Sequence, residues 1–114
     1  MKALIISTDS APHIVDIGPD SYRGLAARFP DGFDSLRLAR GVDAYVGDCS
    51  LIDGSPHNDA GTALADDCYR AVTGEPCHVD IHGLAVILGT TEYGTSVDVP
   101  AEFIAAHDPH LTEG

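Results

Sequence analysis

The sequence predicts a single α+β domain in which two to three helices pack against a mostly antiparallel mixed sheet. Its 114 residues fit one domain that can bury roughly two thirds of its unfolded surface. Short β-rich segments come in pairs, and turn-forming residues separate the members of each pair. Segments with the apolar spacing of a helix follow these pairs, so the expected order is β-β-α-β-β-α-β-β-α.

The first pair of strands covers residues 2–7 and 13–17, which are joined by a turn that contains Pro12. Asp20 precedes the next segment and is a good N-cap for a helix. That helix ends at residues 30–32, where proline and glycine stop it. The apolar face expected for it, spaced i, i+3, i+4 and i+7, consists of Tyr22, Leu25, Ala26 and Phe29.

The second pair of strands is expected at residues 33–39 and 42–46, and a long polar loop follows at residues 47–59. Asn58 or Asp59 caps the second helix, which ends at Gly74. The face expected to be buried consists of Leu64, Cys68, Ala71 and Val72.

The third region holds one or two strands within residues 77–89, bent or broken at Gly83. The fully apolar run at residues 84–88 predicts a strand in the sheet centre that is buried on both faces. A short strand at Val97 and Val99 and a helix from Pro100 to about His107 complete the domain. Residues 108–114 are expected to form a flexible tail.

The formal net charge is −12, and all of the excess negative charge lies in residues 41–114. This part of the sequence contains thirteen acidic residues, and Arg70 is its only arginine or lysine. Such a field disfavours direct binding of nucleic acid or anionic membranes and favours a basic protein partner. Solubility or adaptation to high salt explains the same charge without any partner. The acids expected to form a partner-binding surface lie around the loop and the second helix: Asp48, Asp53, Asp59, Asp66 and Asp67.

We expect a soluble, cytoplasmic protein, because the longest apolar run is too short for a membrane span and no secretion signal opens the chain. Its three cysteines are expected to be free thiols, with Cys68 and Cys77 in the core and Cys49 exposed.

Residues 78–82 carry the strongest candidate for chemistry, because a strand would place His78, Asp80 and His82 on one face. Neighbours on that face are about 6.6 to 7 Å apart, which is wide for three ligands of one zinc ion. We therefore expect no cofactor and no essential metal. No nucleophile elbow and no phosphate-binding motif occurs in the sequence.

A second candidate site is a ligand pocket for a nucleotide-like molecule. The only concentrated basic group of the chain lies in its first 40 residues, and arginine suits phosphate recognition. The turn at residues 89–94 supplies hydroxyl groups and glycine. The candidate ligand-binding residues are Arg23, Arg28, Arg37, Arg40, Thr90, Thr91 and Tyr93.

Residues 80–100 contain the spacing D-x-x-G-x-x-V-x-x-G, from Asp80 to Gly89, followed by G-x-x-x-D-x-P, from Gly94 to Pro100. With the block at residues 44–64, this pattern resembles domain-of-unknown-function family 3846, small proteins of actinobacterial phages and plasmids and of their hosts. The chain looks like a divergent member, since it departs at Asp48, Cys49 and Gly61 and by an insertion at residues 73–77. The resemblance implies a setting on mobile elements in the bacterial cytoplasm and carries over no catalytic residue.

These observations favour a non-catalytic accessory protein of a phage or mobile element that binds a host protein or regulatory complex. The alternatives are a binder of a nucleotide-like ligand and a metal-dependent enzyme centred on residues 78–82. The sequence indicates no oligomeric state.

Overall fold

In the described residues, nine elements follow one another in the predicted β-β-α-β-β-α-β-β-α order. The structure is a computed structural model that describes residues 1–9, 11–47, 55–75 and 80–107. The elements are β1 (Lys2–Ile6), β2 (His13–Asp16), α1 (Ser21–Arg28), β3 (Phe33–Ala39), β4 (Val42–Gly47), α2 (Asp59–Thr73), β5 (Ala85–Thr90), β6 (Ser96–Val97) and α3 (Ala101–Ala106).

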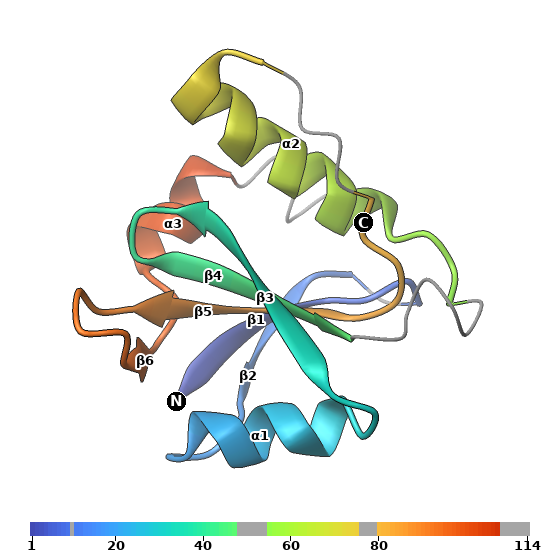
Figure 1. The fold of residues 1–114 in the computed structure, drawn as a ribbon, viewed down its shortest axis with the longest axis vertical. Helices are drawn as coiled ribbons and strands as arrows, with labels where there is room; N and C mark the ends of the chain where they lie inside the picture. Colours follow the sequence, from blue (N-terminus) through green and yellow to red (C-terminus); the bar gives the residue numbers. More distant parts are fainter. Residues whose placement is uncertain (10, 48–54, 76–79, 108–114) are drawn as a thin grey trace.

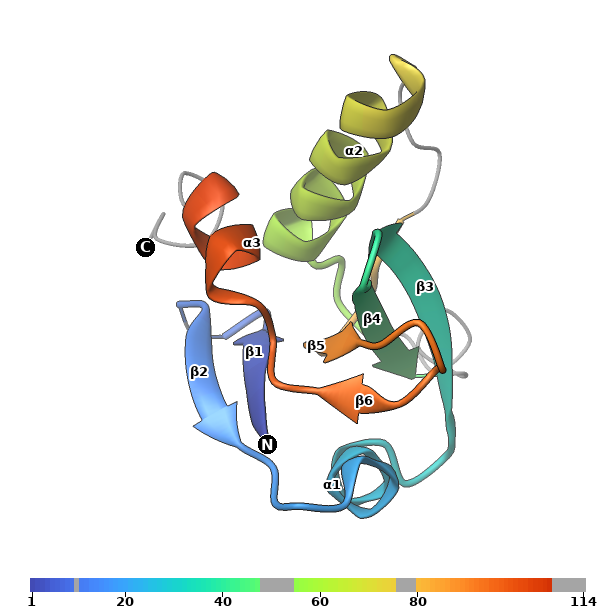
Figure 2. The same cartoon turned by 90° about the vertical axis from the view of Figure 1, so that its left-hand side faces the viewer.

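All strand pairings in the sheet are antiparallel. The strand order is β2-β1-β5-β4-β3, and β6 pairs with the end of β5. Helix α1 covers one face of the sheet, while α2 and α3 cover the other (Figure 1; Figure 2). The predicted α+β class is confirmed, with a sheet that is antiparallel throughout the described residues rather than mixed.

The central strand β5 divides the core into two clusters, as the apolar run predicted. Ala85 and Ile87 face α2 and α3, where they join Leu4, Ile6, Leu64 and Phe103. Val86 and Leu88 face α1, where they join Leu25 and Phe29. Each of these four β5 side chains is at most 1% exposed, so the strand is buried on both faces.

The predicted helix caps are confirmed. Asp20 accepts a hydrogen bond from the Arg23 amide, and Asn58 accepts one from the Gly61 amide. Gly74 ends α2 with a φ of 76°, in the left-handed region that glycine enters most readily. His107 caps the end of α3.

Three expectations of burial or structure were wrong. Tyr22, Ala71 and Val72 are exposed, and Ala71 and Val72 lie in the last turns of α2. The end of α2 rises away from the sheet in both views (Figure 1; Figure 2). Residues 80–83 do not form a strand; only His82 makes an isolated antiparallel bridge, to His57.

Gly89 allows a close approach of the chain that leads into α3. A Cβ atom at this position would lie 2.5 Å from the carbonyl oxygen of Asp98, closer than any side chain permits. Glycine at this point therefore lets residues 96–100 cross the end of β5 and start α3 over the sheet. The long polar loop is described only at its ends, and the tail at residues 108–114 lies outside the described residues.

Within the described part of the chain, no helix is long and apolar enough to cross a membrane.

Candidate binding site

Strand β3 forms one edge of the sheet. It pairs with β4 on its inner side, and no strand of the described residues pairs with its outer side. In an edge strand, alternate residues direct their backbone N–H and C=O groups outward, where they can pair with another chain. The register with β4 shifts between Arg37 and Ala39, which marks a β-bulge near the end of the strand.

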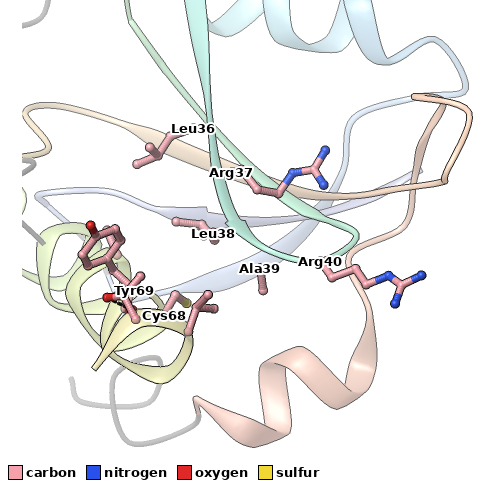
Figure 3. A pocket seen from close by; sticks show the side chains of 10 residues that line it. Leu36, Arg37, Leu38, Ala39, Arg40, Cys68 and Tyr69 are labelled. Atoms are coloured by element: carbon pink, nitrogen blue, oxygen red, sulfur yellow. Dashed lines mark hydrogen bonds between the residues drawn. The ribbon is translucent and has the colours of Figure 1, made fainter. Parts of the chain in front are cut away.

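An apolar groove lies between this edge and α2 and has a volume of about 260 Å³ (Figure 3). Tyr69 and Val72 form the outer rim on α2 and remain 42% and 75% exposed. Exposed apolar side chains beside an open strand edge are the physical features of a docking surface. The apolar residues that line the groove are Leu36, Leu38, Ala39, Ala65, Cys68, Tyr69 and Val72.

A second, polar hollow of about 210 Å³ is formed by Arg37, the β3–β4 turn, the end of β5 and the residues that follow it. Arg37 and Arg40 line both spaces. In Figure 3 their guanidinium groups point away from the apolar side chains of the groove. The other residues around the hollow are Gly41, Thr90, Thr91 and Glu92.

The two arginines differ in what they contact. Arg37 Nε donates a hydrogen bond to Asp43 Oδ1, and Thr90 Oγ1 donates to Asp43 Oδ2 at 2.8 Å. These two donors satisfy the carboxylate of Asp43, which is 9% exposed. Arg40 is exposed and makes no hydrogen bond or ion pair with any described residue. Arg40 is therefore the arginine of this site that pairs with no carboxylate of the described residues.

The sequence-based ligand site is brought together in part. Arg37, Arg40, Thr90 and Thr91 surround the polar hollow. Arg23 and Arg28 lie on α1, on the opposite face from α2, and line neither space. Tyr93 is 88% exposed and also lies outside both.

The acids expected to bind a partner are already engaged within the protein, as far as the structure describes them. Asp59 lies 2.6 Å from His57 Nδ1, at the start of α2. Asp66 pairs with Arg70 at 2.8 Å, and Asp67 lies 2.6 Å from Nδ1 of His107, at the end of α3. All three belong to α2. Asp48 and Asp53 lie outside the described residues.

A polar cluster joins the start of α2 to residues 80–83. His57 Nε2 lies 3.3 Å from Asp80 Oδ1 and also 3.3 Å from Thr62 Oγ1. The His57 and His82 rings meet edge to face, with centroids 5.2 Å apart. Asp80 and His82 thus do not line one face of a strand, and His78 lies outside the described residues. No group of three His, Cys, Asp or Glu side chains in the described ranges could hold a metal.

The His57 contacts predict a pH dependence of stability. Hydrogen bonds that the His57 ring donates to the carboxylates of Asp59 and then Asp80 raise the pKa of His57 above 6.5, because they favour the protonated ring. The stabilisation is fully present below pH 6.5 and is lost as the pH rises through the raised pKa. Urea unfolding should be measured from below pH 6.5 to above the raised pKa of His57. The difference in free energy of unfolding between wild type and His57→Gln should become smaller as the pH increases. A constant gap for His57→Gln would contradict the assignment.

Cys68, His107 and Asp67 have the order of a cysteine–histidine–acid triad, but their chemistry is not that of a nucleophile. The Sγ of Cys68 lies 3.8 Å from His107 Nε2, and Asp67 holds the other ring nitrogen. Burial, followed by the charge of Asp67, raises the pKa of Cys68 to about 11. The group therefore stays a thiol at neutral pH. The contacts of His107 with Cys68 and Asp67 instead connect the end of α3 to α2. The predicted burial of Cys68 is confirmed, since the residue is 3% exposed.

Cys68 should accordingly react slowly with iodoacetamide at neutral pH. The measurement uses a Cys49→Ser/Cys77→Ser variant, so that Cys68 is the remaining thiol. Unfolding with urea should restore the rate of an ordinary cysteine, because both burial and the nearby carboxylate are removed. A fast reaction in the folded state would show that the thiolate is stabilised.

No protein-family model, curated protein or solved structure matches the chain. The family resemblance of the motifs at residues 44–64 and 80–100 therefore stays a prediction.

The sequence analysis missed the apolar groove, although part of its signal was present. Tyr69 and Val72 are three residues apart, so they lie on the same side of a helix. Their exposure depends on where the sheet ends beneath α2, which spacing along the helix does not encode. The position of β3 at the edge follows from the order of the strands in the sheet, which the spacing of residues along one strand does not encode either.

Proposed function

We propose that this is a non-catalytic binding protein that captures an extended segment of another protein along the outer edge of β3. The supporting observation is the open edge of β3 beside the apolar groove with exposed Tyr69 and Val72. In the setting implied by the motif resemblance, the target is a host protein or regulatory complex in the cytoplasm of a host bacterium.

Strand addition explains how such a site would gain both affinity and specificity. Backbone groups of the incoming segment would pair with the outward N–H and C=O groups of β3. Alternate side chains of an added strand face the same side of the sheet, so every second one would enter the groove below α2. Apolar side chains would displace water from Tyr69 and Val72, which favours binding.

The side chains of the described residues favour binding over catalysis. Cys68 is a buried thiol with a raised pKa, and His57 is held between two carboxylates. The metal-dependent alternative gains no support from Asp80 and His82, which share no strand face.

The test compares wild type with a Tyr69→Gln/Val72→Gln variant. Both substitutions remove apolar surface and keep good helix propensity, so α2 should remain intact. A partner isolated from host lysate on wild-type protein should be lost on this variant and kept on a Tyr93→Gln control. Amide hydrogen exchange of the complex should show new protection in β3. Unchanged binding by the double variant, or protection elsewhere without β3, would refute the proposal.

The excess of acids supports a partner with a basic surface around the bound segment. Association should then weaken at high ionic strength, because salt screens exposed charges. Equal affinity at low and high ionic strength, or after neutralising Asp48, Asp53, Asp59, Asp66 and Asp67 together, would leave solubility as the role of these acids.

A small nucleotide-like ligand is the second candidate, because Arg37, Arg40, Thr90 and Thr91 surround one hollow. Against it, Asp43 already neutralises Arg37, and Glu92 adds a further negative charge. Mass spectrometry of molecules released by heating the purified protein distinguishes the two functions. A stoichiometric phosphorylated compound would favour the second.

A further inference from the structure

The face of β3 that borders the apolar groove continues past the groove to Asp34. This residue lies opposite Val46 of β4, which packs against the core cluster under α2. Leu36 lies opposite Ala44, which belongs to the same cluster. Directly opposed residues of an antiparallel pair share one face of the sheet. Asp34 and Leu36 therefore both lie on the α2 side of β3, and the groove begins at Leu36.

The carboxylate of Asp34 is not neutralised within the part of the chain that the structure describes. It is exposed and forms no hydrogen bond or ion pair with a described residue. Arg37 is the next cation along β3, but alternate residues of a strand face opposite sides. Its guanidinium pairs with Asp43 and points away from the groove (Figure 3). An open carboxylate beside apolar surface favours a ligand that brings a positive charge.

Strand geometry fixes how a ligand would meet Asp34 and the groove together. In a strand added to the outer edge of β3, the residues directly opposite Asp34 and Leu36 are two positions apart and lie on the α2 side. The register shift of β3 falls between Arg37 and Ala39, so both positions precede the bulge. The ligand residue opposite Leu36 reaches the apolar groove, and the one opposite Asp34 meets a carboxylate.

We propose that the partner segment carries a lysine or arginine two residues from an apolar residue, with the basic side chain paired with Asp34. This inference rests on the proposed function. Opposite charges directly across two strands stabilise their pairing, and like charges there destabilise it. The net charge of −12 acts in the same direction, because it attracts basic segments to the protein as a whole. Asp34 thus selects against segments that have an acid at this position.

The first experiment selects octapeptides on purified wild-type protein from a random display library. Selected peptides should carry lysine or arginine two positions from an apolar residue, more often than at any other spacing. Enrichment of apolar residues at alternate positions, without a basic residue at this spacing, would overturn the pairing with Asp34 and leave strand addition in place. Enrichment of no peptide would overturn both proposals.

The second experiment measures the affinity of one selected peptide and of the same peptide with glutamate in place of its basic residue. Wild type should bind the basic peptide about fivefold or more tightly, because the exchange turns an attractive cross-strand pair into a repulsive one. Asp34→Lys should abolish this preference.

Asp9→Lys is the matched control for the overall charge. It changes the net charge by the same amount, in the turn between β1 and β2, at the other side of the sheet from β3. The preference for the basic peptide should persist in this variant. A preference that survives in Asp34→Lys, or that is lost equally in Asp9→Lys, would overturn the assignment of Asp34.

Discussion

Replacing Asn58 with alanine should destabilise the protein by about 3 to 5 kcal/mol, far more than the loss of an ordinary helix cap. Asn58 is 1% exposed. Its Oδ1 accepts from the Gly61 amide, while its Nδ2 donates to the carbonyl oxygens of Ile6 and Gly83, at 2.9 and 2.7 Å. One side chain thus ties α2 to the end of β1 and to the segment before β5. Alanine would leave three backbone groups without this partner.

Two further variants separate the cap from the carbonyl contacts. Asp20→Ala removes the exposed cap of α1 and should cost about 1 kcal/mol in urea unfolding. Asn58→Asp keeps an acceptor for the Gly61 amide but places a carboxylate against two carbonyl oxygens. It should therefore destabilise at least as much as Asn58→Ala. A cost for Asn58→Ala no larger than that for Asp20→Ala would show that the buried contacts contribute little.

Ile87→Ala should lower the free energy of unfolding by about 2 to 5 kcal/mol, because a buried cavity remains where the side chain was. Ile87 is 1% exposed and pairs with Leu4 of β1 and Ala44 of β4. It lies in the core cluster under α2 and α3.

Thr91→Ala, in the turn that follows β5, is the control for this prediction. It removes a partly exposed side chain and one hydrogen bond to the Thr95 amide, so its effect should stay near 1 kcal/mol or below. Chemical denaturation of the three proteins at one pH gives the comparison. Equal, small effects of both substitutions would mean that β5 is not in the core.

The element order could be predicted from the sequence because the relevant signals are local. Asp20, Asn58 and Gly74 mark helix ends through contacts within a few residues, and the run at residues 84–88 encodes burial on both faces. The short strand at Val97 was predicted from a weaker local signal, the valines that follow a turn.

The candidate site was harder to predict because it depends on contacts between distant segments. Arg40 and Thr91 were both identified as ligand candidates, but only the order of strands puts them beside one hollow. The expectation for His78, Asp80 and His82 relied on a strand at residues 77–83. In the structure, the amides of Asn58 and Gly83 instead bond to the carbonyls of Ile81 and Pro56, and this short bridge replaces a regular strand.

The division of β5 between the two clusters has a consequence for how the protein unfolds. Alternate side chains of β5 belong to the core clusters on opposite faces of the sheet. If β5 leaves its place, both clusters therefore lose their packing together. Unfolding should therefore be a single cooperative transition, with the same midpoint for a probe on α1 and a probe on α2. In amide exchange, the slowest protons should be those of β5 and its neighbours β1 and β4, which open only when the whole domain opens.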